Sequence, residues 1–193
     1  MTFEVKQQEA YSRGELLLRT FLGAIYIGFP HGFILLFLGL WGNILSFITF
    51  WIILFTGSYP ESFFEYQLKL LKWSTRVNLR MNNLADGYPA FGLETEDDAF
   101  QLEVPYSETT SRSSVLIRFL FGWLYVILPH MFVLIFRMYA TLFLMFLAFF
   151  AVLFTGKYPE SWFRFNVGTM RWTMRVNLYM AYMIDEYPPF SGK

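Results

Sequence analysis

Residues 16–55 read LLLRTFLGAIYIGFPHGFILLFLGLWGNILSFITFWIILF and are almost entirely apolar. The stretch is about twice as long as the ~20 residues that one helix needs to cross a bilayer core. No lysine or arginine follows Arg19 until Lys69, and His31 is the only titratable base between them. The stretch therefore predicts a helical hairpin with membrane spans at about 16–37 and 40–56. A soluble protein with a buried helix pair is the alternative, but little of the chain remains to cover so much apolar surface.

The pattern occurs twice, because a shift of 99 residues places Pro30-His31 on Pro129-His130 without a gap. FTGSYPES at 55–62 recurs as FTGKYPES at 154–161, and DGYPAF at 86–91 recurs as DEYPPF at 185–190. The second hairpin would have spans at about 115–136 and 138–155. We therefore divide the chain into a first repeat, 1–91, an acidic linker, 92–99, and a second repeat, 100–193.

The composition excludes several classes of protein. Hydrophobic residues make up 55% of the chain and charged residues 16%, which is typical of a membrane protein. The formal net charge is zero, so no basic domain could neutralise the phosphates of a nucleic acid. Cysteine is absent, which excludes disulfides and thiolate metal sites. The chain also lacks a Gly-x-Ser-x-Gly motif, and we predict neither a catalytic residue nor a metal site.

The positions of the cations predict the orientation. Of the 15 lysines and arginines, only Arg137 falls in a predicted turn within a hairpin. The positive-inside rule then places both termini and the central linker in the cytoplasm. The predicted location is the bacterial inner membrane, with a multi-pass chain. Because each repeat has an even number of spans, the two repeats should be related by a pseudo-two-fold axis along the membrane normal.

Each repeat begins with a short alternating stretch, Phe3 to Lys6 in the first and Phe100 to Val104 in the second. Alternation of apolar and polar residues is typical of a strand. In one interpretation these stretches are only linkers on the cytoplasmic face. In the other, the two strands pair across the repeats, because isolated edges would otherwise stay exposed.

The first predicted span of each repeat contains a proline followed by a histidine, Pro30-His31 and Pro129-His130. Proline removes one backbone hydrogen bond and frees a carbonyl one turn earlier, so we expect a kink and a new partner for that carbonyl. Each imidazole could simply hydrogen-bond within the protein. Alternatively, the two histidines could meet as axial ligands of haem b or as a proton-handling pair.

The second span of each repeat should end at Gly57 or Gly156, because glycine tolerates the backbone of a helix stop. An amphipathic helix follows, at about 60–85 and 159–184, with a basic stripe typical of an interfacial helix. The alternative is a helix packed on the hairpins with solvated cations. The predicted lipid- or partner-binding residues are Lys69, Lys72, Trp73, Arg76, Arg80, Arg164, Arg171, Trp172 and Arg175.

Two further polar positions are the same in both repeats. Asn78 and Asn177 fall within the apolar arc of the amphipathic helix, where an unpaired amide would cost about 1–3 kcal/mol. We therefore expect each to bond a hairpin, the other repeat or another subunit. Asp86 and Asp185 follow the negative end of that helix and need a cation. Arg76 and Arg175 are the predicted partners, across the repeat boundary, and a surface aspartate without a partner is the alternative.

Both repeats contain the same series of features: a short strand, Arg19 or Arg118, Pro-His, Phe-Thr-Gly-x-Tyr-Pro-Glu, Trp-x-x-Arg-Val and Asp-x-Tyr-Pro-x-Phe. This series resembles the bacterial domain-of-unknown-function 4389 family. The resemblance covers nearly the whole chain as two tandem copies. It implies a small bacterial inner-membrane protein, and it implies no activity.

The sequence thus predicts an all-α membrane protein: four transmembrane helices in two tandem hairpins, each followed by a cytoplasmic amphipathic interfacial helix, with room for short cytoplasmic strands. The predicted function is a non-enzymatic scaffold or accessory subunit that docks anionic lipid or other membrane protein subunits. No cofactor is predicted under this interpretation. A haem- or proton-handling subunit that uses His31 and His130 is one alternative, and a lipid-handling or transport component is another.

Overall fold

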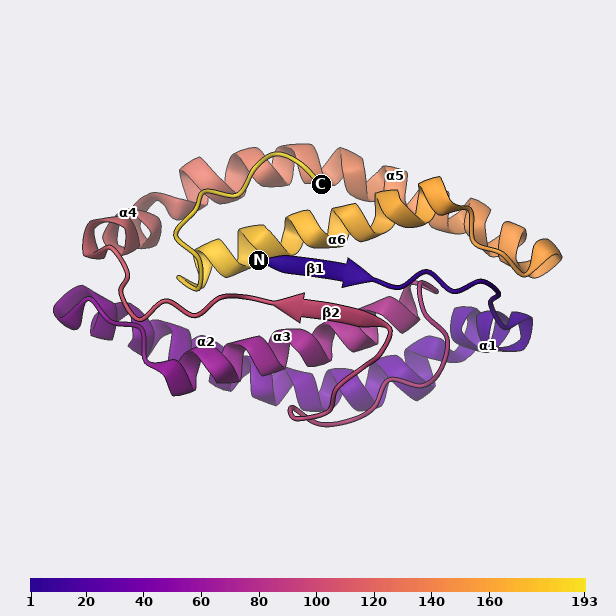
Figure 1. The fold of residues 1–193 in the computed structure, drawn as a ribbon, viewed down its shortest axis with the longest axis horizontal. Helices are drawn as coiled ribbons and strands as arrows, with labels where there is room; N and C mark the ends of the chain where they lie inside the picture. The colour runs from indigo at the N-terminus through magenta and orange to yellow at the C-terminus, as the bar shows by residue number, and fades with distance from the viewer.

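The computed structural model describes all residues, 1–193, and shows the two repeats as equivalent units (Figure 1). Equivalent helices have the same length in both. The first repeat contains β1 (Thr2–Val5), α1 (Arg13–Gly23), the π-helical turn η1 (Ala24–Gly28), α2 (Phe29–Thr56) and α3 (Glu61–Met81). The second contains β2 (Phe100–Glu103), α4 (Arg112–Gly122), η2 (Trp123–Ile127), α5 (Leu128–Thr155) and α6 (Glu160–Met180).

The long apolar stretch of each repeat forms one helix. Residues Arg13–Thr56 and Arg112–Thr155 are helical throughout, 44 residues each, and both are apolar enough for a membrane. The predicted hairpin turns, near 38–39 and at Arg137, are therefore wrong. Residues 36–41 contain no proline, and the single Gly39 does not stop a helix. The hairpin rested on length alone, and nothing in the local sequence ends the helix there.

The prolines stand at the second residue of α2 and α5, directly after the π-helical turns. The amide of Phe29 bonds the carbonyl of Ala24, and that of Leu128 bonds Trp123, five residues back in each case. The sequence predicted a kink at these prolines. The structure places a π-helical turn directly before each proline, and both features are recognised causes of a helix kink.

Glycine ends both long helices, as predicted. Gly57 has φ of 80° and Gly156 has φ of 74°, and their amides bond the carbonyls of Ile53 and Val152. Only glycine adopts this left-handed conformation without a steric penalty. The chain reverses here, and α3 and α6 start after Pro60 and Pro159 and run back along the long helices.

Replacement of Gly156 by alanine should lower the free energy of unfolding by about 1 kcal/mol. A Cβ at this position meets no atom within 4 Å, so the cost arises from the positive φ alone. Gly32→Ala is the matched control, because Gly32 also has open space but helical φ, and alanine should stabilise α2 there by up to about 1 kcal/mol. Thermal unfolding in detergent measures both, and equal effects of the two substitutions would contradict the assignment of Gly156 as a cap.

The two predicted strands pair across the repeats, which confirms the second of the two interpretations. β1 and β2 are antiparallel, with Phe3 opposite Leu102 and Glu4 opposite Gln101. Phe3 and Leu102 are equivalent residues, 99 apart, so the pseudo-two-fold axis passes between them. Their side chains face inward and are buried, while Glu4 and Gln101 are exposed.

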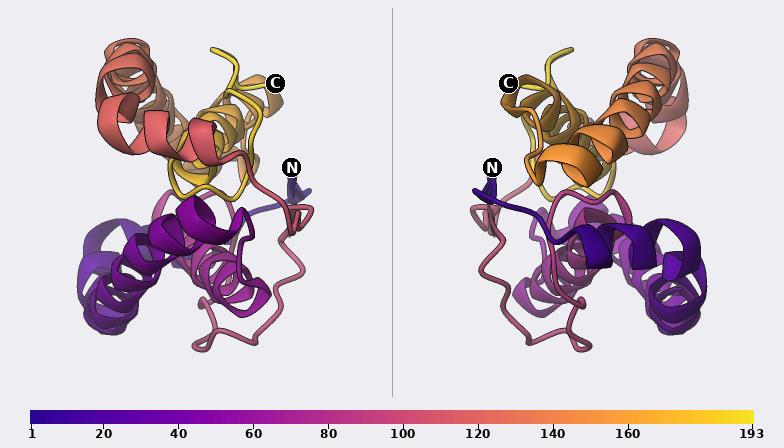
Figure 2. Two further views of the ribbon diagram at one scale, coloured as in Figure 1. Left: turned by 90° about the vertical axis from the view of Figure 1, so that its left-hand side faces the viewer. Right: turned by 90° about the vertical axis from the view of Figure 1, so that its right-hand side faces the viewer.

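The molecule has a polar layer and an apolar layer. The strand pair and both termini lie on one broad side, which faces the viewer in Figure 1, and the long helices lie behind α3 and α6. The end views show the long helices bowing away from the strands, with their ends nearest the polar layer (Figure 2). The main core lies between the layers and includes Phe3, Leu102, Leu79 and Leu178.

Candidate functional site

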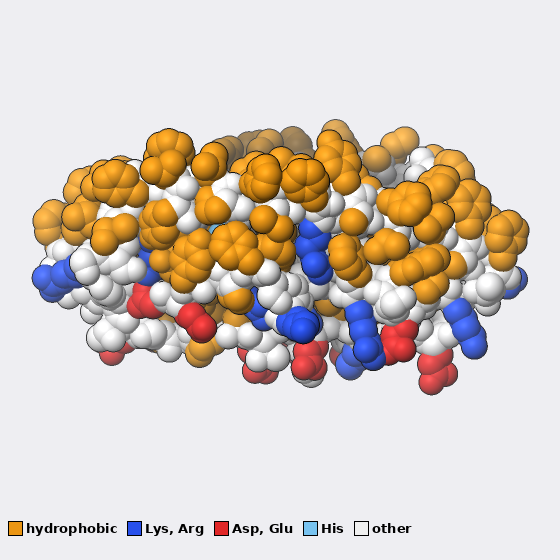
Figure 3. Space-filling model, turned by 90° about the horizontal axis from the view of Figure 1, so that it is seen from above, with side chains coloured by type: hydrophobic (Ala, Val, Ile, Leu, Met, Phe, Trp, Pro, Cys, Tyr) orange, Lys and Arg blue, Asp and Glu red, His pale blue; other side chains and the backbone are white.

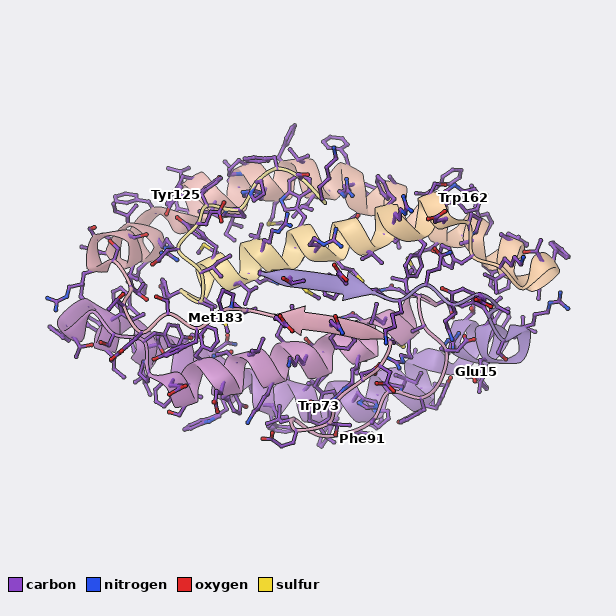
Figure 4. The ribbon with its side chains drawn as sticks, viewed as in Figure 1. Glu15, Trp73, Phe91, Tyr125, Trp162 and Met183 are labelled. Atoms are coloured by element: carbon purple, nitrogen blue, oxygen red, sulfur yellow. The ribbon has the colours of Figure 1, made fainter.

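Each repeat has a buried aromatic cluster around its histidine. The indole Nε1 of Trp73 donates a hydrogen bond to His31 Nδ1 at 3.0 Å, and the rings of His31 and Phe91 stack with centroids 3.9 Å apart. Trp73 and Phe91 lie next to each other at the outer side of α3 (Figure 4). Because an indole N–H can only donate, Nδ1 presents a lone pair, and the proton of the neutral ring lies on Nε2.

The second repeat reproduces this cluster. Trp172 Nε1 donates to His130 Nδ1 at 2.8 Å, and Phe190 stacks on the imidazole with centroids 4.1 Å apart. Both imidazoles are 0% exposed. The interpretation in which each imidazole bonds within the protein is therefore confirmed. The structure does not bring His31 and His130 together as one ligand pair, because each is enclosed by aromatic side chains of its own repeat.

The carbonyl freed by each proline has the partner that the sequence required. Tyr88 Oη donates to the carbonyl of Tyr26 at 3.1 Å, and Tyr187 Oη donates to that of Tyr125 at 2.9 Å. Both carbonyls precede a proline by four residues, so the helix itself offers them no amide. The Asp-x-Tyr-Pro-x-Phe motif thus supplies the hydroxyl for this carbonyl and the phenyl ring that stacks on the histidine.

Tyr187→Phe should lower the free energy of unfolding by about 1–3 kcal/mol, because it leaves the Tyr125 carbonyl without a partner. Pro129→Ala restores an amide that can bond this carbonyl, so the loss should be smaller in the double variant than in the single one. The control is Tyr139→Phe, at an exposed tyrosine of α5. Chemical unfolding in detergent measures the two single variants and the double variant. If Tyr187→Phe lowers the unfolding free energy by the same amount with and without Pro129→Ala, the assigned role of Tyr187 is contradicted.

The aspartates of this motif pair with arginines of the long helices. Arg19 binds Asp86 at 2.6 Å and Glu15 at 2.7 Å. Arg118 pairs with Asp185 and also donates to Ser114 and to the carbonyls of Tyr179 and Ile184. The predicted partners, Arg76 and Arg175, are therefore wrong. An arginine on α1 or α4 is closer because the loop after α3 or α6 returns over the start of the long helix of its own repeat.

The basic stripe of α3 lies beneath the acidic linker. Arg80 pairs with Asp97 at 2.7 Å, Lys69 pairs with Glu94 at 2.8 Å, and the buried Arg76 donates to the carbonyls of Gly92 and Thr95. The hydrogen bond with Glu94 raises the pKa of Lys69. The stripe thus binds the chain's own linker, and α3 packs on the long helix of its repeat.

The stripe of α6 is engaged in the same way. Arg171 donates to the carbonyl of Phe3 at 2.8 and 3.0 Å and to that of Gly192 at 2.9 Å, so it ties the second repeat to β1 of the first. Arg175 bonds the carbonyl of Ser191 at 3.4 Å, and Arg164 pairs with Glu160 on its own helix. Trp73 and Trp172 are buried beside the histidines. Of the predicted set, Lys72 alone has no ion pair or hydrogen bond.

Three other polar side chains lie elsewhere than predicted. Asn78 and Asn177 are exposed, and Asn78 bonds the carbonyl of Ser74 on its own helix at 2.9 Å, so neither is a buried contact between repeats. Arg137 lies in the middle of α5 and turns back to α6, where it bonds Thr169 Oγ1 at 2.9 Å and lies over the ring of Phe165. The long helices thus keep their few cations away from their outer side.

The outer side of the long helices forms a continuous apolar face (Figure 3). Lysine, arginine, aspartate and glutamate gather on the opposite side of the molecule. We use the name apolar face for the exposed hydrophobic residues of the two long helices, which comprise α1, η1 and α2 in the first repeat and α4, η2 and α5 in the second. Its strongly exposed residues include Phe21, Ile25, Phe29, Phe33, Phe37, Phe47 and Phe55, and Trp123, Phe132, Phe136, Tyr139, Phe143, Phe146 and Phe154. A face of this extent is unusual for a soluble protein.

Two of the hollows on the surface adjoin the apolar face and the acidic linker. One, of about 770 Å³, lies on the apolar face beside Pro129 and Phe190, and eight of its nine lining residues are hydrophobic. The other, of about 420 Å³, lies on the polar layer between β2 and the acidic linker, and Lys6, Lys69 and Lys72 face carboxylates there. The side chains contain no group of three or more His, Asp or Glu that could hold a metal ion.

Comparison with known families agrees with the motif pattern. Residues 112–192 match the family described as "Domain of unknown function (DUF4389)". The second repeat is a DUF4389 domain. The match contains Arg118, His130, Trp172, Asp185, Tyr187 and Phe190, so the cluster described above lies within the DUF4389 unit. No curated protein and no solved structure matches the chain. The first repeat has the same order of elements as the DUF4389 domain, with equal helix lengths.

Arg19, Tyr88 and Phe91 and their equivalents in the second repeat are site residues that were not among the predicted ones. All three residue types occur at the same place in both repeats, which was an available signal. The unpaired carbonyl before Pro30 also called for a donor, and the tyrosine hydroxyl of the repeated motif is a natural candidate.

Proposed function

We propose that this protein is a non-enzymatic membrane scaffold or accessory subunit, embedded through its apolar face and docking another membrane protein subunit. The observation that carries the proposal is the division of the surface into an apolar face on two long helices and a charged layer opposite to it (Figure 3). Exposed phenylalanines in such number would drive aggregation in water, whereas acyl chains cover them at little cost.

The repeated polar residues support a scaffold. Arg19, Arg118, His31 and His130 are buried and bound to neighbouring side chains or carbonyls, so they serve to hold the fold. The charged layer is on the side of the termini, and a chain that keeps this layer on the side of its synthesis leaves it in the cytoplasm. The proposed location is therefore the cytoplasmic face of the bacterial inner membrane.

The hollow on the polar layer is the proposed contact with the partner. Lys72 lines it without an ion pair of its own, among carboxylates of the linker and β2, so the hollow offers charges of both signs to a polar group of another subunit. The second repeat has no free cation at the equivalent position, because Arg171 of α6 binds the carbonyl of Phe3.

Affinity purification from native membranes tests the proposal. The protein should resist an alkaline carbonate wash and, after mild detergent extraction, should retain a protein partner in stoichiometric amount. Lys72→Glu should reduce recovery of that partner, while Lys157→Glu, at an exposed cation beyond α5, should not. Release by carbonate would contradict the membrane assignment, and recovery of the chain alone in every detergent would contradict the subunit role.

A lipid-handling role is a second candidate, favoured by the hollow beside Pro129, whose apolar lining suits an acyl chain. Mass spectrometry of lipids that copurify with the protein distinguishes it. One lipid class should be enriched over the bulk membrane, and Val133→Trp, which fills the hollow, should abolish the enrichment. Bulk lipid composition in both proteins would remove this candidate.

A further inference from the structure

We infer that the apolar face is covered by the acyl chains of a single leaflet, so that both long helices enter and leave the membrane on the same side and no residue reaches the far side. This inference rests on the proposed membrane embedding. It differs from the four transmembrane spans predicted from the sequence, because no segment of the chain crosses the bilayer. The occupant of the face is the cytoplasmic leaflet.

The length of the helices argues against one crossing each. At 44 residues, a straight helix would measure about 66 Å, roughly twice the ~30 Å hydrocarbon core. A helix of this length could cross only with a strong tilt and with its two ends on opposite sides of the membrane.

The connections place all four helix ends on one side. The amide of Tyr11, just before α1, bonds the carbonyl of Gly156, just after α5, at 2.8 Å. In the same way the amide of Thr110, just before α4, bonds the carbonyl of Gly57, just after α2, at 2.9 Å. Each long helix therefore starts where the other ends, and both junctions continue directly into segments that lead to β1 and β2 on the polar layer (Figure 1).

The thickness of the apolar layer fits one leaflet. It consists of the two long helices, which contact each other near their ends and lie apart at their middles, without a second layer of helices beyond them (Figure 2). A helix with its side chains is about 10–12 Å across, which is close to half of a ~30 Å hydrocarbon core. The middle of each helix bows farthest from the polar layer, and the single arginine there, Arg137, turns back to α6 rather than outward.

A spin-label scan tests the inference on the intact protein in lipid vesicles. The chain has no cysteine, so single cysteines can be placed along the first long helix at Phe21, Phe29, Phe37, Leu40, Phe47 and Phe55, all of which are exposed. Collisions with oxygen relative to a water-soluble nickel complex report the depth of each label. Single-leaflet insertion gives one depth maximum, at Phe37 and Leu40. Two hairpin spans would give two maxima with a minimum at 38–40, and that result would overturn the inference.

Labelling from each side of the membrane supplies the second measurement. A membrane-impermeant maleimide should modify Gln101→Cys on β2 only in inside-out vesicles. Leu40→Cys and its equivalent Tyr139→Cys should stay unmodified in vesicles of either orientation and react after detergent is added. Modification of either in right-side-out vesicles would overturn the inference while leaving the proposed membrane embedding intact. Recovery of a water-soluble pair of copies, joined by their apolar faces, would contradict both.

Discussion

Replacement of Arg118 by methionine should lower the free energy of unfolding by about 3–5 kcal/mol. The guanidinium is 0% exposed and serves four acceptors at once: Ser114 Oγ, Asp185 and the carbonyls of Tyr179 and Ile184. Methionine fills a similar volume but donates nothing. The two carbonyls then remain at the end of α6 without a donor, and each such loss costs about 1–3 kcal/mol.

The environment of Arg118 explains why lysine should not replace it. The planar guanidinium contacts acceptors on three sides and lies over the ring of Tyr179, 4.2 Å from its centroid. A lysine carries the same charge, but its single ammonium cannot bond the Ser114 hydroxyl and the carbonyls of Tyr179 and Ile184 at the same time. Arg118→Lys should therefore recover only part of the stability.

Arg164→Met is the matched control. Arg164 lies on α6 and pairs only with Glu160, with both side chains largely exposed to solvent, so its loss should change the unfolding free energy by less than about 0.5 kcal/mol. Unfolding in mixed micelles, followed by tryptophan fluorescence, measures both variants. Equal losses for the two would show that the buried network does not determine stability.

The parts of this fold that depend on local chemistry could be predicted from the sequence. Gly57 and Gly156 end their helices because glycine adopts the required positive φ without a steric penalty, and this preference is local to the residue. The alternation of apolar and polar residues from Phe3 to Lys6 likewise indicated a strand, because this pattern is also a local property of the sequence. Each proline also leaves the carbonyl four residues before it without an amide partner, and the hydroxyls of Tyr88 and Tyr187 supply the missing donors.

The course of the long helices could not be predicted in the same way. A hairpin of two short helices and one bowed helix satisfy the same apolar pattern, since both bury their backbone hydrogen bonds and expose apolar side chains to lipid. Length favoured the hairpin. The structure differs from the hairpin because long-range hydrogen bonds, such as that from the Tyr11 amide to the Gly156 carbonyl, hold the helix ends. The periodicity of the sequence does not predict such bonds.

The partners of the charged side chains were hidden for a related reason. A basic stripe such as that of Lys69, Arg76 and Arg80 looks the same whether it faces phospholipid or an acidic segment of its own chain. The segment that covers it, 92–99, has no regular structure and carries carbonyl acceptors that the sequence cannot place. Arg19 and Asp86 meet across 67 residues, and only the chain reversal after α3 brings them together.

Lysine substitutions along the apolar face should show the largest loss in the middle of each long helix. Leu40→Lys on α2, at a residue 53% exposed, should lower the free energy of unfolding from lipid vesicles by about 2–3 kcal/mol, because the ammonium lies where the leaflet is driest. Tyr139→Lys, at the equivalent site of α5, should behave alike. Phe55→Lys should cost less than about 1 kcal/mol, because a lysine at the helix end can extend its ammonium to the headgroups.

The order of these losses discriminates between the two courses of the chain. In a hairpin, residue 40 would begin the second span at the far surface, so Leu40→Lys would be tolerated and the loss would peak near Ile48. In a bowed helix within one leaflet, Leu40→Lys is the most damaging. Gln101→Lys, on the exposed side of β2 opposite Glu4, is the control for an added charge and should leave stability unchanged. Urea titration of the protein in vesicles gives the series, and a smaller loss at Leu40 than at Phe55 would refute the bowed helix.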